Sequence, residues 1–513
     1  MPYLRQCTSF LIAALAVLVS SVPTSAQQVI DLTLERMVEL TMQNSFRIQR
    51  VDLDLQRTRY NLQAEQARLK SQVDLRLQLP TINVQSEAEF DASLGRNIIA
   101  RENSQRWQAD LSISQPVILF GYPTGGELSV NSRVFQYKQV DNEGDIFNQY
   151  YNRYFLRYEH GLFQPNELKN DLEQAQLDVE ESQLEYQEDL IDVINSVAYT
   201  YLGIFRQAYE LEIERAYIER LRTALALAED LADEDPERES DVEQITIELA
   251  NAEQELQQTR AEFRRRSVEI KQDLRLSPMD SLVILDPQLD INPVEFDTEL
   301  AIGRARELTP RLRNIQINYR KSEIGLQEYE GRSGFRMDLE FTYGREMRDE
   351  VWNDLFGEPE DSYSVSIDAN LPIWDWGARD ARIQSRRIGL EQTRLRMEEE
   401  QLEIDADIAN QITSLEENES RVFSMSNNFE LAQTSTDRAL DRYGSGTIGI
   451  LELLQALDRE QETHENMLDA YSAWRRGLIN LRGATWWDWE RNMPALEGFG
   501  ISVADDLDFD TDE

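Results

Sequence analysis

Cysteine, histidine and recognisable catalytic motifs are scarce in this chain of 513 residues. The one cysteine, Cys7, lies in an N-terminal segment with the features of a cleaved signal, so the mature chain has no thiol, disulfide or cysteine metal site. The two histidines, His160 and His464, are better explained as solvated or packed residues than as ligands. No phosphate-binding glycine loop and no nucleophile motif is present. We therefore expect neither an enzyme nor a metal or cofactor site.

A long apolar run is missing as well. Residues 1–26 read as a signal sequence, with Arg5 before a short apolar run, Phe10–Val19, and Thr24-Ser25-Ala26 as the cleavage site. Cys7 precedes that run, which argues against a lipid-anchored protein. Beyond residue 30 no segment approaches the about 18 to 20 apolar residues that a membrane-spanning helix needs. If this chain crosses a membrane, it must do so as a closed β-barrel.

Positive charge is in short supply. Lysine and arginine together number 52 against 96 aspartate and glutamate residues, and the formal net charge is −44. An electric field of that sign excludes nucleic acid as a natural partner. An acidic, lysine-poor surface fits a high-salt habitat, where salt screens self-repulsion, and it fits arginine-rich codon usage equally well.

Proline is rare, and two long stretches contain none. One is the 70 residues between Pro165 and Pro236, and the other is the 121 residues between Pro372 and Pro494. A continuous helix over the first stretch would be about 100 Å long. Within these stretches and the next helical segment apolar residues recur every seven positions, as in Ile204, Leu211, Ile218, Leu225 and in Ile388, Leu395, Leu402, Ala409. The spacing predicts helices packed side by side with coiled-coil geometry, in either a soluble bundle or a helical tube.

The chain also repeats itself. A shift of 211 residues superimposes apolar and basic positions over about a hundred residues without a gap, for example Leu184 on Leu395, Phe263 on Trp474, and Arg264-Arg265 on Arg475-Arg476. Near the start of each half the best shift is 264 residues, which places Asp74-Leu75 on Asp338-Leu339. The first half therefore carries about 53 extra residues, which we place within roughly 90–150.

This repeat predicts the domain organisation. Residues 27–290 form a first repeat and residues 291–490 a second, each with a helix, a hairpin and a long helix pair. The second hairpin is expected at 335–374, and the ends of the long helix pairs, which we call the tips, at about 231–241 and 440–452. Residues 491–513 are an acidic tail.

Segments that alternate apolar and polar residues precede the long helices. The clearest is 363–373, where apolar side chains from Tyr363 to Ile373 alternate with Ser364, Ser366 and other polar residues. Similar alternation occurs at 75–79, 154–158 and 339–343, and within the extra segment at 111–113 and 128–130. A membrane barrel requires such segments of about ten residues, although an ordinary half-buried sheet alternates too. The extra segment therefore either extends a surface hairpin or adds strands.

Three segments of the chain carry a resemblance to a known family. They are the opening helix from Leu32-Thr33-Leu34-Glu35 to Asn44, the segment Leu371-Pro372-Ile373-Trp374-Asp375-Trp376-Gly377-Ala378-Arg379, and the tip segment Arg442-Tyr443-Gly444-Ser445-Gly446-Thr447-Ile448. With them the chain resembles the TolC-like outer-membrane efflux proteins. The resemblance covers the mature chain to about residue 490, apart from the extra segment.

The resemblance implies a mainly α fold with a membrane β-barrel part. Such proteins are homotrimers in which each protomer gives four strands to one shared barrel in the outer membrane, and the extra segment leaves open whether this chain gives more. Their long coiled-coil-like helices form a tube in the periplasm. The implied partners are a periplasmic adaptor protein, an inner-membrane pump and outer-membrane lipid. Trp374, Trp376 and Tyr363 are expected to be aromatic residues at the membrane interface.

The family likeness also implies a gate at the tips. Glu452 stands where the family has an acidic residue at the periplasmic entrance, and the 211-residue shift carries it to Asp241. The family's second acidic position is Gln455 here, matched internally by Gln244, which weakens the anionic ring.

Family gates are held closed by a tyrosine, an arginine and an aspartate. Tyr443 and Asp241 match two of these, whereas the arginine position is Ile448.

The adaptor would dock on the tips. Gly444 and Gly446 permit chain reversal and close helix approach, and Thr447 and, in the first tip, Pro236 complete the expected docking residues. The function that follows is a passive export duct opened at its tip by an adaptor and a pump. A periplasmic coiled-coil scaffold without a pore is the alternative, and drug efflux, protein secretion and metal export remain open as roles.

Overall fold

The computed structural model describes residues 29–91, 96–120, 122–140, 146–277, 279–284 and 288–501, without the side chains of 29–31, 85–91 and 96–103. The expected signal sequence and most of the acidic tail lie outside these residues. The chain forms two compact units: unit 1 contains residues 1–49, 189–308 and 405–513, and unit 2 contains 50–188 and 309–404. Each unit takes segments from both sequence repeats, so the division of the chain at residue 290 remains a prediction.

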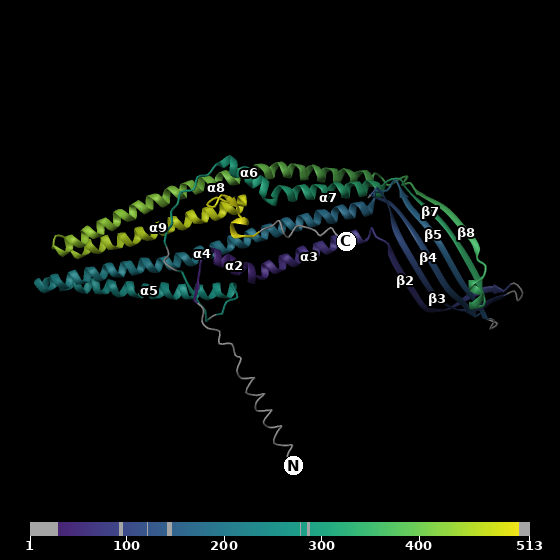
Figure 1. Ribbon diagram of the computed structural model, residues 1–513, viewed down its shortest axis with the longest axis horizontal. Helices are drawn as coiled ribbons and strands as arrows, with labels where there is room; N and C mark the ends of the chain where they lie inside the picture. Colours follow the sequence, from purple (N-terminus) through teal and green to yellow (C-terminus); the bar gives the residue numbers. More distant parts are fainter. Residues whose placement is uncertain are drawn as a thin grey trace, which may run out of the picture. The chain divides into compact units, whose positions relative to one another are not determined.

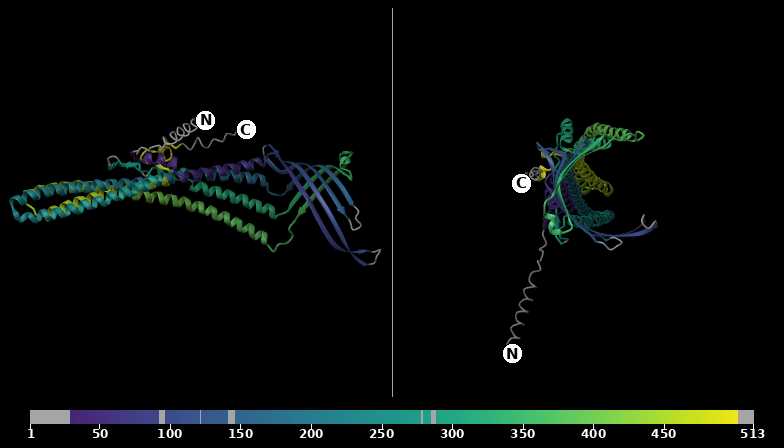
Figure 2. Two further views of the ribbon diagram at one scale, coloured as in Figure 1. Left: turned by 90° about the horizontal axis from the view of Figure 1, so that it is seen from below. Right: turned by 90° about the vertical axis from the view of Figure 1, so that its right-hand side faces the viewer.

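Unit 2 contains a six-stranded antiparallel sheet (Figure 1). Its order is β2 (Gln72–Asp91), β3 (Arg96–Leu119), β4 (Tyr122–Val140), β5 (Ile146–Leu162), β7 (Arg336–Asp349) and β8 (Glu360–Asn370). β3 and β4 lie wholly within the extra segment predicted at 90–150, which therefore adds strands. Figure 2 shows that the sheet is curved.

The predicted alternation gives this sheet one apolar and one polar face. A single apolar row crosses all six strands through the directly opposed residues Val73, Ile113, Val130, Leu156, Tyr343 and Tyr363. The other face carries a charged row of Arg76, Asp110, Arg133, Arg153, Glu346 and Glu360. The same face also has three glutamates directly opposed on neighbouring strands, Glu127, Glu159 and Glu340. Arg157 lies 3.0 Å from Glu159 and 3.5 Å from Glu340.

The helices of unit 2 are α3 (Phe46–Ala67), α7 (Pro310–Ser333) and the first parts of α4 (Glu167–Glu234) and α8 (Ala378–Gly444). Leu62 of α3 packs with Ala175 and Val179 of α4. The seven-residue apolar stripe predicted to pack against neighbouring helices is not covered in α8, because Ile388, Leu395 and Leu402 are 59%, 51% and 70% exposed. The described part of unit 2 has no element over this face, so the packing expected for this stripe remains a prediction.

Unit 1 contains α2 (Leu34–Asn44), α5 (Glu239–Asp273), α6 (Thr298–Leu308), α9 (Ile450–Thr485) and the remaining parts of α4 and α8. Two short sheets pair β1 (Val29–Asp31) with β6 (Ser281–Val283), and β9 (Trp487–Asp488) with β10 (Met493–Pro494).

The long helices of unit 1 follow the sequence pattern. α4 runs for 68 residues without a break, as the absence of proline predicted. Its stripe residues Ile204, Leu211 and Ile218 are buried. The predicted fold class, long helices with a sheet of several strands, is confirmed. Within the described chain, no helix combines the length and the apolar character that crossing a membrane would take.

Candidate functional site

The first tip joins α4 to α5 through a short 3-10 turn, Pro236–Arg238. Asp235 caps this turn, because its side chain accepts a hydrogen bond of 3.1 Å from the backbone N–H of Glu237. Pro236 occupies the first position of the turn, where a backbone N–H is not needed. The Asp-Pro-Glu sequence thus reverses the chain without glycine, and Pro236 lies exposed at the end of the hairpin.

The second tip joins α8 to α9 and depends on glycine. Gly446 has a φ of +69°, a conformation that only glycine adopts at little cost. The N–H groups of Gly446 and Thr447 donate to the carbonyls of Tyr443 and Arg442, both at 2.8 Å, which satisfies the last carbonyls of α8. A Cβ at Gly444 would lie 3.2 Å from Leu227, so this glycine lets the end of α8 approach α4 closely.

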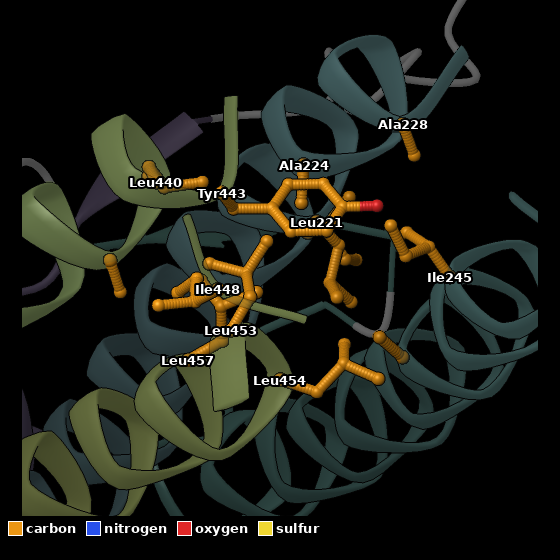
Figure 3. Close-up of a cluster of buried hydrophobic side chains, with 13 residues drawn as sticks. Leu221, Ala224, Ala228, Ile245, Leu440, Tyr443, Ile448, Leu453, Leu454 and Leu457 are labelled. Atoms are coloured by element: carbon orange, nitrogen blue, oxygen red, sulfur yellow. The ribbon is translucent and has the colours of Figure 1, made fainter. Parts of the chain in front are cut away.

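The two tips share one hydrophobic core, which we call the tip cluster (Figure 3). Its buried residues come from both helix pairs and from the second turn: Ile218, Leu221, Ala224, Ala228, Ile245, Ala252, Ala439, Leu440, Tyr443, Ile448, Leu453, Leu454 and Leu457. Because the cluster is continuous, one helix pair cannot swing away from the other without exposing apolar surface to water.

Tyr443 and Asp241, which the sequence paired through the family resemblance, are in contact. The Tyr443 hydroxyl donates a hydrogen bond of 3.0 Å to Oδ2 of Asp241, in the first turn of α5. Tyr443 is fully buried, and this burial, followed by the bond to Asp241, raises the pKa of its hydroxyl above the usual value of 10. The hydroxyl therefore keeps its proton and remains a donor. We call this bond between α8 and α5 the tip latch.

Arg238 is the residue of the tip that sequence reasoning missed. Its guanidinium carbon lies 6.0 Å from the centre of the Tyr443 ring. Its Nη1 is buried and has no hydrogen-bond partner in the described chain. The position where the family has arginine holds Ile448, which is 5% exposed in the tip cluster. One feature of the sequence could have indicated Arg238: it precedes Asp241 by three residues, about one helical turn, a spacing at which side chains can meet.

Glu452, the expected gate carboxylate, is exposed in the first turn of α9. It pairs with Arg442 of α8 at 3.4 Å, an exposed ion pair of the kind that contributes about 0 to 1 kcal/mol. Gln455 is exposed one turn further along α9. Thr447, expected to contact an adaptor, is exposed and shares a hydrogen bond of 2.9 Å with the Ser445 hydroxyl. The structure thus gives the Glu452 charge a cationic neighbour.

The expected interface aromatics lie in unit 2. Trp374 and Trp376 follow β8 and are 74% and 89% exposed, with ring centres 5.4 Å apart in an edge-to-face arrangement. Asp375 between them accepts backbone hydrogen bonds from Gly377 at 2.9 Å and Arg379 at 2.7 Å. This cap starts α8, and both tryptophans are exposed just before the helix. Tyr363 in β8 is 79% exposed.

Comparison with known families identifies part of this chain. Residues 324–485 match the family model described as outer membrane efflux protein. The matched region includes β7, β8, α8 and α9, and therefore the second tip. No curated protein matches the sequence.

Solved structures share the fold over most of the chain. The outer-membrane channel OprN is 17% identical with a TM-score of 0.63, covering 89% of this chain and 90% of its own. VceC, an outer membrane protein of the bacterial pathogen Vibrio cholerae, is 13% identical with a TM-score of 0.62, covering 88% and 95%. The MtrE outer membrane channel of Neisseria gonorrhoeae, solved in its open state, is 12% identical with a TM-score of 0.59, covering 90% of each chain.

At these identities the structural likeness establishes the fold, and the family model independently identifies the efflux domain. The family match confirms the predicted resemblance over residues 324–485, which contain two of the three sequence segments, and the solved structures confirm the fold. The chain thus carries an outer membrane efflux protein domain at residues 324–485 and has the fold of the TolC-like outer-membrane channels.

Proposed function

We propose that three copies of this chain form a passive efflux duct through the outer membrane, closed at the tips and opened there by an adaptor and a pump. The observation that carries the proposal is the tip latch, in which buried Tyr443 donates to Asp241 across two helix pairs. A scaffold protein would not require a buried tyrosine held against a carboxylate at the end of its hairpins.

The sheet of unit 2 supports the membrane location. Its apolar row includes Val73, Val130 and Tyr363, which are 65%, 53% and 79% exposed. An apolar face of that extent is stable against lipid and costly against water. Trp374 and Trp376 then lie just past the last strand, where interface aromatics are enriched.

Opening requires that the tip latch breaks. A hydrogen bond to a charged acceptor contributes about 1.5–3 kcal/mol, and the tip cluster adds the cost of exposing its apolar surface. Arg238 lies beside the latch, near the Tyr443 ring, and its Nη1 is buried without a hydrogen-bond partner in the described chain. An adaptor can lower the barrier by taking over these polar partners.

The first tip suggests how the adaptor recognises this chain. The sequence Asp233-Glu234-Asp235-Pro236-Glu237 is exposed and strongly acidic. A partner that docks there needs a basic surface, because complementary charge steers association.

The decisive test is to substitute Tyr443→Phe and record single channels of the purified protein in planar bilayers. We expect the wild type to conduct mostly in short openings. Loss of the latch, at about 1.5–3 kcal/mol, should raise the ratio of open to closed time by about tenfold or more. Tyr199→Phe is the matched control, because Tyr199 donates to Asn480 between α4 and α9, outside the tip cluster. A wild-type protein that never conducts would support the scaffold instead. Equal open-to-closed ratios in the two variants would show that the tip latch does not hold the channel closed.

Ion selectivity tests the charge at the entrance. With three copies around one axis, Glu452 and Asp241 form anionic rings that favour cations. Glu452→Gln should lower the cation-to-anion permeability ratio severalfold. Arg442→Gln, which removes the cation paired with Glu452, should raise it. Reversal potentials in a salt gradient measure both. Shifts in the same direction for the two variants would contradict a role of this pair in selectivity.

A further inference from the structure

The sheet of unit 2 ends in two strands without outer partners. β2 and β8 are the edges of the sheet, so one side of each strand presents backbone N–H and C=O groups that no described strand pairs. The side chains of β8 and of residues 72–84 in β2 are almost all exposed on both faces. Inside a membrane no water is present to pair with free backbone groups, so edges like these must be closed by another chain.

The strand count departs from what the family resemblance implies. That resemblance gives four strands per protomer, whereas this chain has six consecutive antiparallel strands in one sheet. Resting on the trimeric duct proposed above, we infer that β8 of each copy pairs with β2 of the next. Three six-stranded sheets then close one barrel of 18 strands. Barrels of about 16–18 strands leave an open aqueous channel, so the membrane segment would be wide and porin-like.

Strand directions permit this closure. Every neighbouring pair in the sheet is antiparallel, so β2 and β8, the first and sixth strands, run in opposite directions. A copy placed alongside by rotation about an axis normal to the membrane therefore brings β8 against β2 as another antiparallel pair. The visible curvature of the sheet is in keeping with a closed barrel (Figure 2).

The apolar face restricts how the two edges align. Val73, Leu75 and Leu77 of β2 lie on the same face as Tyr363, Val365 and Ile367 of β8, as the continuous apolar row shows. A slip of one residue would turn one strand's apolar side chains to the polar face. Only registers that place odd-numbered residues opposite odd-numbered ones keep the face apolar.

Charge selects among these registers. Arg76 of β2 and Asp368 of β8 lie on the polar face, where Arg76 is opposed to Asp110 of β3 and Asp368 to Asp338 of β7. Placing Arg76 opposite Asp368 joins opposite charges, whereas a shift of two residues places Asp74 against Asp368. The favoured register sets Leu77 opposite Ile367 and Asp74 opposite Asn370, so the start of β2 meets the end of β8.

Cysteine crosslinking tests the closure directly. In a Cys7→Ser background, Leu77→Cys with Ile367→Cys is expressed in membranes and oxidised, and products are separated under denaturing conditions. Opposed Cα atoms fall within disulfide range, whereas a two-residue shift moves them about 7 Å along the strand. We expect covalent dimers and trimers, in several-fold higher yield than with the shifted pair Leu77→Cys and Val365→Cys.

A second pair tests the alternative of four strands. If β4 rather than β2 met the next copy, Val130→Cys with Ile367→Cys would crosslink between copies, and that result would overturn the inference. So would the absence of crosslinks through Leu77 in every register. Bilayer recordings of the same uncrosslinked protein separate the two proposals: a preparation that conducts but lacks the β2–β8 crosslinks refutes only the 18-stranded barrel. A preparation that never conducts refutes the duct itself.

Discussion

Replacing Glu214 by glutamine should stabilise unit 1 at pH 8 and make its stability fall on acidification below about pH 6.5. Glu214 in α4 is only 8% exposed. Its burial, and then the carboxylates of Glu255, Glu465 and Glu210, raise its pKa from 4.5 to about 7. Because the folded-state pKa is raised, Glu214 contributes stability that is fully present below about pH 4.5 and is lost as the pH rises through about 7. At pH 8 the wild type therefore carries an unfavourable buried charge.

His464 of α9 has the opposite dependence. Its ring stacks on Phe429 with 3.9 Å between ring centres, and it shares a hydrogen bond of 3.1 Å with the Tyr209 hydroxyl. Burial lowers its pKa from 6.5 to about 4. Its contribution to stability is present above about pH 6.5 and is lost as the pH falls through about 4. Between pH 4.5 and 6.5 the two groups offset each other, each changing the free energy of unfolding by up to about 1.4 kcal/mol per pH unit.

Urea unfolding, followed by helical circular dichroism at pH 5, 6, 7 and 8 in detergent, measures these slopes. The wild type should vary little between pH 5 and 6, Glu214→Gln should lose stability towards pH 5, and His464→Gln should gain it. Glu243→Gln, at an exposed position of α5, is the control and should follow the wild type. If Glu214→Gln has the same pH profile as the wild type, ionisation of Glu214 in the folded protein does not lower its stability.

Leu453→Ala should produce the largest loss of stability at the tips, about 2–5 kcal/mol. Leu453 is fully buried in the tip cluster, next in sequence to Glu452, and its truncation leaves a cavity that rigid neighbouring helices fill only partly. The reduced packing should also weaken the tip latch, because Tyr443 belongs to the same cluster. Amide hydrogen exchange should therefore speed up in residues 440–457 and 221–228.

The neighbouring residue provides the control for this substitution. Leu451 is 61% exposed, so Leu451→Ala should change stability by no more than about 0.5 kcal/mol and leave the exchange rates unaltered. Equal effects of the two substitutions would mean that the tip cluster does not hold the helix pairs together.

The elements that local physics determines were predictable from the sequence. The absence of proline predicted the unbroken α4, and the alternation of apolar and polar residues predicted the faces of β7 and β8. The pairing of Tyr443 with Asp241 followed from the internal repeat together with the family resemblance, because 202 residues separate the two positions and no local pattern connects them.

What the sequence left open depends on contacts distant along the chain. Alternation at 111–113 and 128–130 fitted either a hairpin extension or new strands, and only the pairing of β3 and β4 distinguishes these. Arg238 was missed because it comes from the first tip, whereas the family's arginine position lies in the second. The stripe at Ile388, Leu395 and Leu402 had coiled-coil spacing, but spacing does not say whether its partner belongs to the same chain.

The three opposed glutamates of the sheet connect its closure to the surrounding electrolyte. Glu127, Glu159 and Glu340 lie on adjacent strands, about 4.8 Å apart, with Arg157 as the cation beside them. In 0.1 M salt the screening length is about 10 Å, longer than this spacing, so more than half of the repulsion between neighbouring carboxylates remains. In 1 M salt it shrinks to about 3 Å and the repulsion fades within one strand. At high salt, mobile counterions therefore do for a chain with a net charge of −44 what Arg157 does locally for these three glutamates.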